Sequence, residues 1–124
     1  MAFPKSLLAV AGLLTVASPA AAQNATAGGT LFKQRCMMCH TISPDGRPSM
    51  GPNLLGVVGR PAASAQFGYS PALKKSGLTW DKATLDTFLT SPGKLVPGTR
   101  MVFPIPDDKQ RADVIAYLAS LKKK

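Results

Sequence analysis

The chain has 124 residues and carries 15 lysines and arginines against 6 acidic residues, which gives a net charge of +9 and an isoelectric point near 10.0. This length accommodates one small domain with a modest core and excludes a multidomain protein. A surface this basic favours an acidic partner, a nucleic acid or an anionic membrane.

Residues 1–22 have the pattern of a secretory signal peptide. Lys5 supplies the positive start, residues 7–16 form a short apolar run, and Ala20-Ala21-Ala22 offers an A-x-A cleavage site. The run is shorter than the about 20 residues that a membrane-spanning helix needs, and no later stretch could span a bilayer. We therefore expect export to the periplasm and a mature domain over residues 23–124 with no membrane span. An exported protein is not expected to bind nucleic acid.

The first helix is predicted from about Thr26 into Cys36-Met37-Met38-Cys39-His40, which reads C-x-x-C-H. That spacing is typical of covalent attachment of a c-type haem. One helical turn presents both sulfurs to the vinyl groups, and His40 points at the iron as its proximal ligand. Zinc needs about four ligands, but the chain has no other Cys or His. A thioredoxin-like dithiol would need a βαβ context, which is absent from the pattern. The motif therefore predicts one haem c, held through Cys36 and Cys39.

Between His40 and Ser70, prolines and glycines recur every few residues and predict irregular structure without long helices or strands. A structureless stretch of this length inside a small domain usually argues against a compact fold. Wrapping around a rigid cofactor removes that objection.

Two helices follow in the second half of the chain. A short one is predicted over residues 71–75, ended by Gly77. The next begins near Thr79 and Trp80 and is ended by Ser91-Pro92-Gly93. Its apolar face has helical spacing, with members Leu85, Phe88 and Leu89.

The last helix has the clearest pattern. Pro106-Asp107-Asp108 supplies a start and a cap, and three lysines at residues 122–124 close its end. Its buried stripe is predicted to comprise Val114, Ile115, Leu118 and Leu121. The whole pattern predicts an all-α fold: one domain of three to four helices with long loops wrapped around one covalent haem.

A second axial iron ligand is predicted from the methionines, because the chain has no second histidine. The two methionines inside the motif lie too close to His40 to reach the opposite haem face, and Met50 follows in a loop on the proximal side. Met101 lies far enough along the chain to cross, in a proline-bounded loop over residues 97–104. With His40 and Met101 both bound, no open position is left for a substrate. This favours electron transfer over enzymatic chemistry.

With these features in place, the chain resembles class I cytochromes c, close to the mitochondrial and photosynthetic-bacterial carriers. The resemblance extends from about Gly28 to Leu121. The matching blocks, in chain order, are Gly28-x-x-x-Phe32, Cys36 to His40, Gly51-Pro52-Asn53-Leu54-x-Gly56, Gly59-Arg60, Tyr69-Ser70, Gly77-Leu78-Thr79-Trp80, Pro97-Gly98-Thr99-Arg100-Met101-x-Phe103 and Arg111-x-Asp113-x-Ile115-Ala116-Tyr117-Leu118.

The resemblance implies roles for several of these residues. The Pro52 carbonyl would accept the Nδ1 proton of His40 and so fix the imidazole tautomer. The buried inner haem propionate would be held or screened by a polar set, with Thr99 contacting a propionate as well. This set comprises Arg60, Tyr69, Trp80 and Thr99.

Packing roles and two departures also follow from the resemblance. Gly28 and Phe32 would pack against the last helix at Tyr117 and Leu118, and Phe103 would shield the exposed haem edge. Where the family usually has tyrosine and asparagine near the haem, this chain has Phe88 and Leu73. Both changes remove polar groups, so we expect fewer internal hydrogen bonds and a shifted reduction potential of open sign.

The expected function is a monomeric periplasmic one-electron carrier, not an enzyme. It would shuttle between a quinol–cytochrome c oxidoreductase or a dehydrogenase and a terminal oxidase, reductase or reaction centre. Acidic redox partners would dock transiently at the haem edge, near Lys33, Lys94 and Arg100. Two alternatives stay open: a haem subunit of a periplasmic dehydrogenase, and a haem peroxidase or gas sensor if Met101 does not bind iron.

Overall fold

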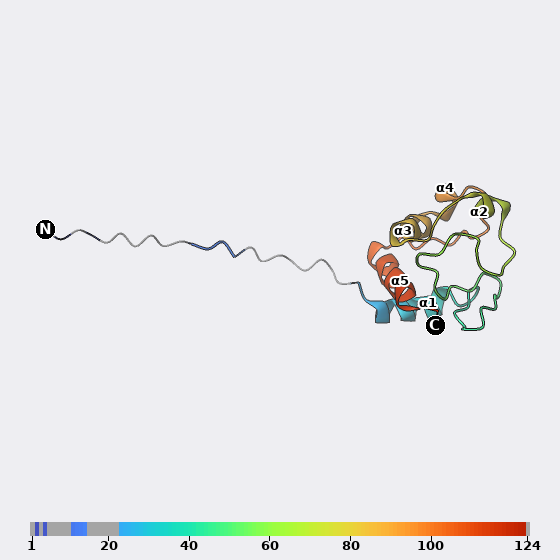
Figure 1. Cartoon of the computed structure of the whole chain (residues 1–124), viewed down its shortest axis with the longest axis horizontal. Helices are drawn as coiled ribbons and strands as arrows, with labels where there is room; N and C mark the ends of the chain where they lie inside the picture. The colour runs from blue at the N-terminus through green and yellow to red at the C-terminus, as the bar shows by residue number, and fades with distance from the viewer. Residues whose placement is uncertain (1, 3, 5–10, 15–22, 124) are drawn as a thin grey trace.

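The computed structural model describes residues 2, 4, 11–14 and 23–123 (Figure 1). Most of the predicted signal peptide and Lys124 lie outside the described residues. The helices of the described chain are α1 (Ala25–Arg35), α2 (Pro71–Lys75), α3 (Lys82–Thr90), α4 (Pro92–Leu95) and α5 (Asp108–Ser120). Among the same residues, β pairing is limited to one isolated antiparallel bridge between Pro61 and Thr79, and no helix is long and apolar enough to cross a membrane. The predicted all-α fold is confirmed.

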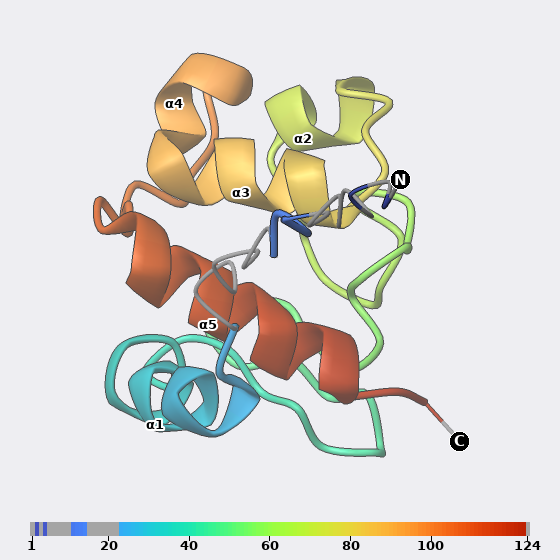
Figure 2. The same cartoon turned by 90° about the vertical axis from the view of Figure 1, so that its left-hand side faces the viewer.

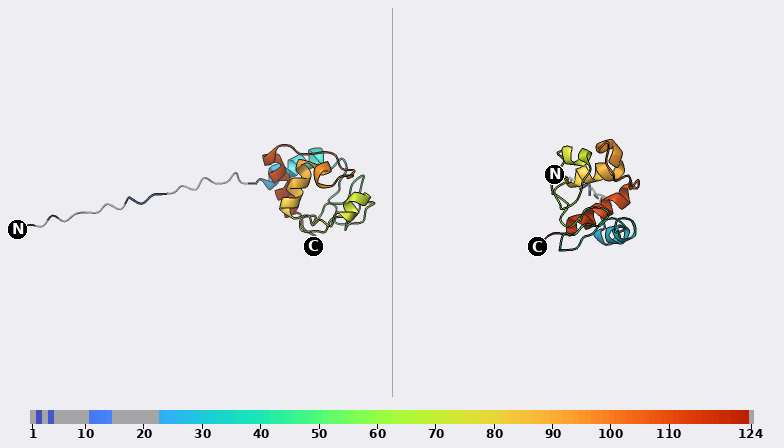
Figure 3. Two further views of the ribbon diagram at one scale, coloured as in Figure 1. Left: turned by 90° about the horizontal axis from the view of Figure 1, so that it is seen from above. Right: turned by 90° about the vertical axis from the view of Figure 1, so that its right-hand side faces the viewer.

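Helices α3 and α5 lie between α1 on one side and α2 and α4 on the other (Figures 2 and 3). The long segment between α1 and α2 closes the remaining side of the domain (Figure 1). Buried apolar side chains from α1, α3 and α5 meet in one core with Val57, Trp80, Val96 and Ile105 from the connecting segments.

Helices α1 and α5 cross in close contact (Figure 2). A Cβ atom placed on Gly28 would lie 1.9 Å from the backbone oxygen of Asp113, so only glycine allows this approach. One turn further along, the fully buried Phe32 packs its ring 5.5 Å from that of Tyr117. The packing of Gly28 and Phe32 against the last helix occurs as predicted.

The start of α1 is also tied to α5 through a buried carboxylate. The backbone N–H of Asn24 donates to Asp113 Oδ1 over 2.8 Å, and Lys109 Nζ donates to the same oxygen over 2.7 Å. These two bonds, the lysine first, lower the pKa of Asp113 below its ordinary value. The side-chain oxygen of Asn24 in turn accepts from the N–H of Ala27 and caps the helix.

Arg111 of α5 joins three parts of the domain although its side chain is almost completely buried. Its Nε donates to Asp86 of α3 over 2.7 Å, and its Nη2 donates to Asp108 over 2.6 Å. Its Nη1 donates to the carbonyls of Ile105 and Pro106. The hydrogen bond to Asp86 raises the pKa of Arg111. A guanidinium group suits this position because its five N–H donors can bind several acceptors at once.

Helix α3 ends at Thr90, directly before Ser91-Pro92-Gly93, as predicted. Pro92 then occupies the first turn of α4, where its missing N–H costs nothing, so the described chain has five helices where three to four were expected. The bounds of two helices also need correction. Helix α3 begins at Lys82 behind the capping Asp81, two to three residues later than expected. Helix α5 ends at Ser120, so Leu121 is its C-cap rather than part of the buried stripe, and the lysines at 122–123 follow the helix.

We predict that Gly28→Ala destabilises the holoprotein by about 3 kcal/mol or more, because α1 and α5 must separate to admit the methyl group. Denaturant unfolding measures the effect. The matched control is Gly93→Ala in α4, whose added Cβ meets nothing within 4 Å and which should change stability by no more than about 1 kcal/mol. Equal unfolding midpoints for Gly28→Ala and the parent would contradict the close crossing.

We predict that Asp113→Asn lowers the melting temperature at pH 7 and that the difference shrinks in acid. The pKa of Asp113 is lower in the folded than in the unfolded chain. Its ionised form therefore stabilises the fold above about pH 4, and that contribution is lost as the pH falls through the folded-state pKa. Melting curves of both proteins between pH 7 and pH 3 test this, and parallel curves would contradict it.

Candidate haem site

The C-x-x-C-H segment continues directly from α1 as a series of tight turns. The N–H of Cys36 donates to the carbonyl of Phe32, and the N–H groups of Cys39 and His40 both donate to the carbonyl of Cys36. Cys36 and Cys39 are unpaired, half-buried thiols. Burial raises the pKa of Cys36, and the neighbouring Arg35 partly offsets this effect. The turns place two thiols and an imidazole on one short, rigid piece of chain.

The imidazole of His40 is oriented by a backbone carbonyl. Its Nδ1 lies 2.8 Å from the oxygen of Pro52, the contact that the sequence predicted. A carbonyl only accepts, so Nδ1 carries the proton and Nε2 is available to bind a metal. Gly51 makes room for the ring, because a Cβ there would lie 2.8 Å from its Cε1 atom. Burial lowers the pKa of His40, which favours the neutral form that metals bind.

Arg60 has an unfulfilled hydrogen-bonding group inside the domain. Its Nη2 donates to the carbonyl of Asn53 over 3.1 Å, but its buried Nε has no partner among the described residues. Burial lowers the pKa of Arg60. A buried cation with a spare donor is costly unless an anion accepts from it. A haem propionate is such an anion, so this group fits the cofactor.

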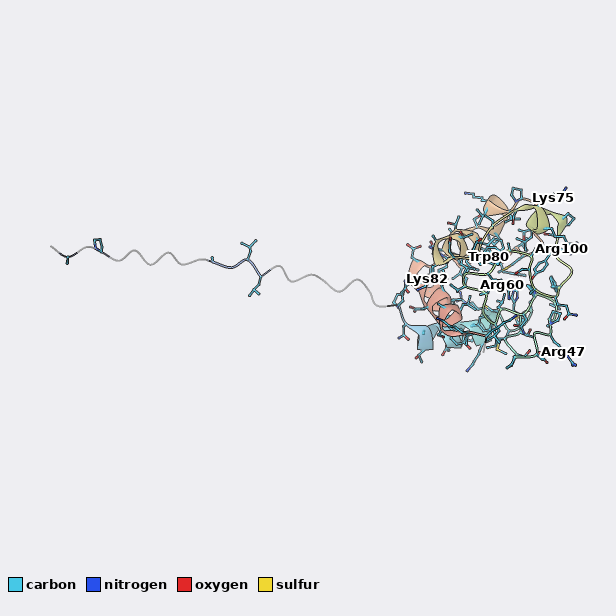
Figure 4. The ribbon with its side chains drawn as sticks, in the orientation of Figure 1. Arg47, Arg60, Lys75, Trp80, Lys82 and Arg100 are labelled. Atoms are coloured by element: carbon cyan, nitrogen blue, oxygen red, sulfur yellow. The ribbon has the colours of Figure 1, made fainter. Side chains whose placement is uncertain are left out.

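Trp80 and Tyr69, the two aromatic members of the predicted propionate-binding set, both lie near Arg60. Arg60 and Trp80 are joined through their backbones, since the N–H of Trp80 donates to the carbonyl of Arg60 over 2.9 Å, and both lie in the interior of the domain (Figure 4). The Tyr69 hydroxyl accepts from the N–H of Ala65, which leaves its own proton free to donate. The ring centroids of Trp80 and Phe88 lie 4.9 Å apart. Phe88 therefore fills this part of the core with a purely apolar ring, where a tyrosine would add a hydroxyl group.

The loop that carries Met101 is fixed at several points. Thr99 Oγ1 accepts from the N–H of Met101 over 3.2 Å and so shapes the turn before the methionine. This local role stands beside the predicted contact of Thr99 with a propionate. Arg100 Nη1 donates to the carbonyl of Gly68 over 3.0 Å and ties this loop to the segment before α2. Met101 itself is half-buried against the core. A soft thioether is thus held at the inner side of a constrained loop.

Asn53 is a site residue to which the sequence analysis assigned no role. Its buried side chain donates to the carbonyl of Ser43 over 2.9 Å and accepts from the N–H of Leu55. Its own carbonyl accepts from Arg60. The block Gly51-Pro52-Asn53 contained the signal, but the role of its asparagine depends on contacts with residues outside that block.

The Cytochrome c family model matches residues 25–122, which includes every residue of the site described above. The chain belongs to the cytochrome c family. The predicted class I cytochrome c is thereby confirmed, and with it one covalent haem c attached through Cys36 and Cys39. Members of this family are electron carriers rather than enzymes, so the protein is an electron carrier of the cytochrome c type.

Individual relatives agree with this assignment. The chain is 48% identical over 112 residues to cytochrome c2 of Rhodomicrobium vannielii, covering 89% of both chains. It is 46% identical over 99 residues to cytochrome c of Tetrahymena pyriformis, covering 79% of this chain and 89% of the relative. The solved structure of cytochrome cH from Methylobacterium extorquens is 47% identical and superposes with a TM-score of 0.72, covering 78% of this chain and 98% of that one.

We predict that Arg60→Gln lowers the reduction potential, because the oxidised haem gains relative stability when a nearby positive charge is removed. The expected shift is about 30–70 mV, the range for one unit charge roughly 10 Å away at an effective dielectric constant of about 20–40. Redox titration followed by absorbance measures it. The control is Arg47→Gln, because the Arg47 side chain is 85% exposed; equal potentials for both variants would contradict the role of Arg60.

Proposed function

We propose that this cytochrome c is a monomeric periplasmic shuttle with a six-coordinate haem. It accepts one electron from a quinol–cytochrome c oxidoreductase or a dehydrogenase and delivers it to a terminal oxidase, a reductase or a reaction centre. The observation that carries the proposal is the combination of a constrained imidazole and a constrained thioether on separate segments of one haem-binding domain. Bound to these residues, the haem iron would supply reversible one-electron chemistry.

His40 and Met101 are the proposed axial ligands. The hydrogen bond from His40 to Pro52 orients Nε2, and Thr99 and Arg100 restrain the methionine loop. A His/Met pair raises the reduction potential relative to other ligand sets. Residues restrained in this way would stay bound to the iron in either oxidation state, so little rearrangement of the protein would accompany electron transfer.

Arg60, Tyr69, Trp80 and Thr99 are the proposed propionate-binding set. The unpartnered Nε of Arg60 and the available hydroxyl proton of Tyr69 support this assignment. Together these residues would neutralise a buried carboxylate and exclude water from it, because a buried charge is tolerated only when it is paired and hydrogen-bonded.

The proposed periplasmic location rests on the signal-peptide pattern of residues 1–22, which predicts export. The matched family region begins at residue 25, shortly after the proposed cleavage site. The mature domain would then cover residues 23–124. Its docking would use the exposed cations Lys33, Lys94 and Arg100, of which Arg100 lies on the loop side of the domain, remote from α3 and α5 (Figure 4).

The ligand assignment is tested by absorption spectra of the oxidised and reduced holoprotein, followed by carbon monoxide addition. We expect a weak sulfur-to-iron charge-transfer band and no carbon monoxide binding. Met101→Ala should abolish the band and admit carbon monoxide, while Met50→Ala should change neither. Ready carbon monoxide binding by the parent protein would instead favour the peroxidase or gas-sensor alternative.

The docking assignment is tested by charge reversal. We predict that Lys33→Glu and Lys94→Glu each slow association with an acidic redox partner about three- to tenfold at low salt, and that both variants show a flatter dependence on ionic strength. Stopped-flow oxidation by a solubilised cytochrome c oxidase measures both quantities. The control is Lys82→Glu, because Lys82 lies on the opposite side of the domain from Arg100 (Figure 4). Salt-independent rates for the parent protein would argue against electrostatic docking.

A further inference from the structure

Asn53 has the least exposed side chain among the buried polar residues of the described chain, at 3%. Its amide nitrogen donates to the carbonyl of Ser43 over 2.9 Å and also approaches the carbonyl of Arg47 at 3.4 Å. Its amide oxygen accepts from the N–H of Leu55 over 2.9 Å. Both ends of the amide are therefore hydrogen-bonded, as a buried polar group requires.

The partners of this amide lie on two segments of the chain. Ser43 and Arg47 belong to a turn that is closed by its own hydrogen bonds, since Asp45 Oδ1 accepts from the Ser43 hydroxyl and from the N–H of Arg47. Leu55 lies two residues beyond Asn53, so the bond to its N–H makes an Asx turn. The side chain of Asn53 thus fixes its own stretch of backbone against a second, closed turn.

Two consecutive carbonyls of this stretch bind two different parts of the haem site. The Pro52 carbonyl accepts from Nδ1 of His40 over 2.8 Å, and the Asn53 carbonyl accepts from Nη2 of Arg60 over 3.1 Å. Because the two carbonyls belong to neighbouring residues, a change in the backbone dihedral angles at Asn53 turns one relative to the other. Hydrogen bonds weaken steeply as their angle becomes less linear, so both bonds require the same backbone conformation.

Neither His40 nor Arg60 has a second side-chain hydrogen bond within the part of the chain that the structure describes. The Pro52 carbonyl is the partner of the His40 ring. The Asn53 carbonyl is the partner of the Arg60 guanidinium, whose buried Nε is left without one. Both side chains are half-buried. The orientations of the imidazole and of the guanidinium therefore depend on one short piece of backbone.

We propose that Asn53 is a positioning residue that couples the imidazole of His40 to the guanidinium of Arg60. Its side chain holds the Pro52 carbonyl toward His40 and its own carbonyl toward Arg60. This inference rests on the proposed roles of His40 and Arg60 in haem binding. A carbonyl bonded to Nδ1 makes an imidazole a more basic ligand, and a nearby cation favours the reduced haem. Asn53 thus acts on the reduction potential through both residues.

The first test is the exchange of the His40 Nδ1 proton for deuterium in the oxidised holoprotein, followed by proton NMR. We expect Asn53→Ala to speed this exchange about tenfold or more, because the Pro52 carbonyl is then free to turn away. The milder Asn53→Ser keeps an oxygen that can accept from Leu55 but loses the amide donor, so it should speed exchange less. It replaces the alanine variant in both tests if that variant yields no folded holoprotein.

The second test is a double-mutant cycle on the reduction potential. The shift caused by Arg60→Gln should be at least halved in the Asn53→Ala protein relative to the parent, because the guanidinium has already lost its fixed position there. Redox titration followed by absorbance measures the four potentials. A shift of full size in both backgrounds would overturn the coupling.

The matched control is Leu85→Ala, which removes buried apolar volume from α3 and leaves the hydrogen bonds of Asn53 in place. Its exchange rate and its Arg60→Gln shift should equal those of the parent, even where its unfolding midpoint falls as far as that of Asn53→Ala. An equal effect of Leu85→Ala would reflect a general loss of stability and would overturn the proposal.

Two further outcomes separate this proposal from the proposed function. Unchanged exchange in both Asn53 variants, with no carbon monoxide binding by the parent protein, would overturn the role of Asn53 while the proposed function stands. A parent protein whose His40 Nδ1 proton resonance is not shifted by the iron would overturn the ligand role of His40 and the role of Asn53 with it.

Discussion

The approach of α1 to α5 at Gly28 is the constraint on which the rest of the domain depends. Backbone meets backbone there, with no room for a Cβ atom, so the relative position of the two helices is set without adjustable side chains. Because α1 runs straight into the turns of Cys36 and His40, fixing α1 also fixes the covalent anchor and the proposed proximal ligand, His40. The bond from Asn24 to Asp113 holds the opposite end of α1 on the same partner helix.

The same helix, α5, organises the other side of the haem site. Arg111 binds Asp86 of α3 and the carbonyls of Ile105 and Pro106, just after the loop that carries Met101. The N–H of Ile105 also donates to the carbonyl of Leu89 at the end of α3. The segments that carry His40 and Met101 are therefore both positioned by contacts with one central helix, which explains how long irregular loops can hold the two proposed iron ligands in place.

The sequence predicted the elements that depend on residues close together in the chain. It did not predict the contacts that depend on residues far apart in the chain. The 71–75 helix and the turn of Cys36 to His40 were predictable because spacing, caps and motif suffice. Helix α4 was missed because Pro92 can equally end one helix or begin another. The buried ionic groups Arg111 and Asp113 were assigned no structural role, since their partners lie on other elements. For the same reason, the roles of the site residues were inferred from the family resemblance and not from the spacing of residues in the sequence.

The distribution of aspartates separates the charges that hold the fold from those available to partners. Every aspartate of the chain contributes to the fold. Asp81 and Asp107 cap helices, Asp86 and Asp108 bind Arg111, Asp113 binds Lys109 and Asn24, and Asp45 shapes a turn beside Arg47. With 15 basic residues against these 6 acids, most basic side chains are not needed to neutralise an aspartate. Exposed pairs contribute little to stability in any case. Selection on partner binding can therefore change exposed cations such as Lys33 and Lys94 without disturbing the packing beneath them.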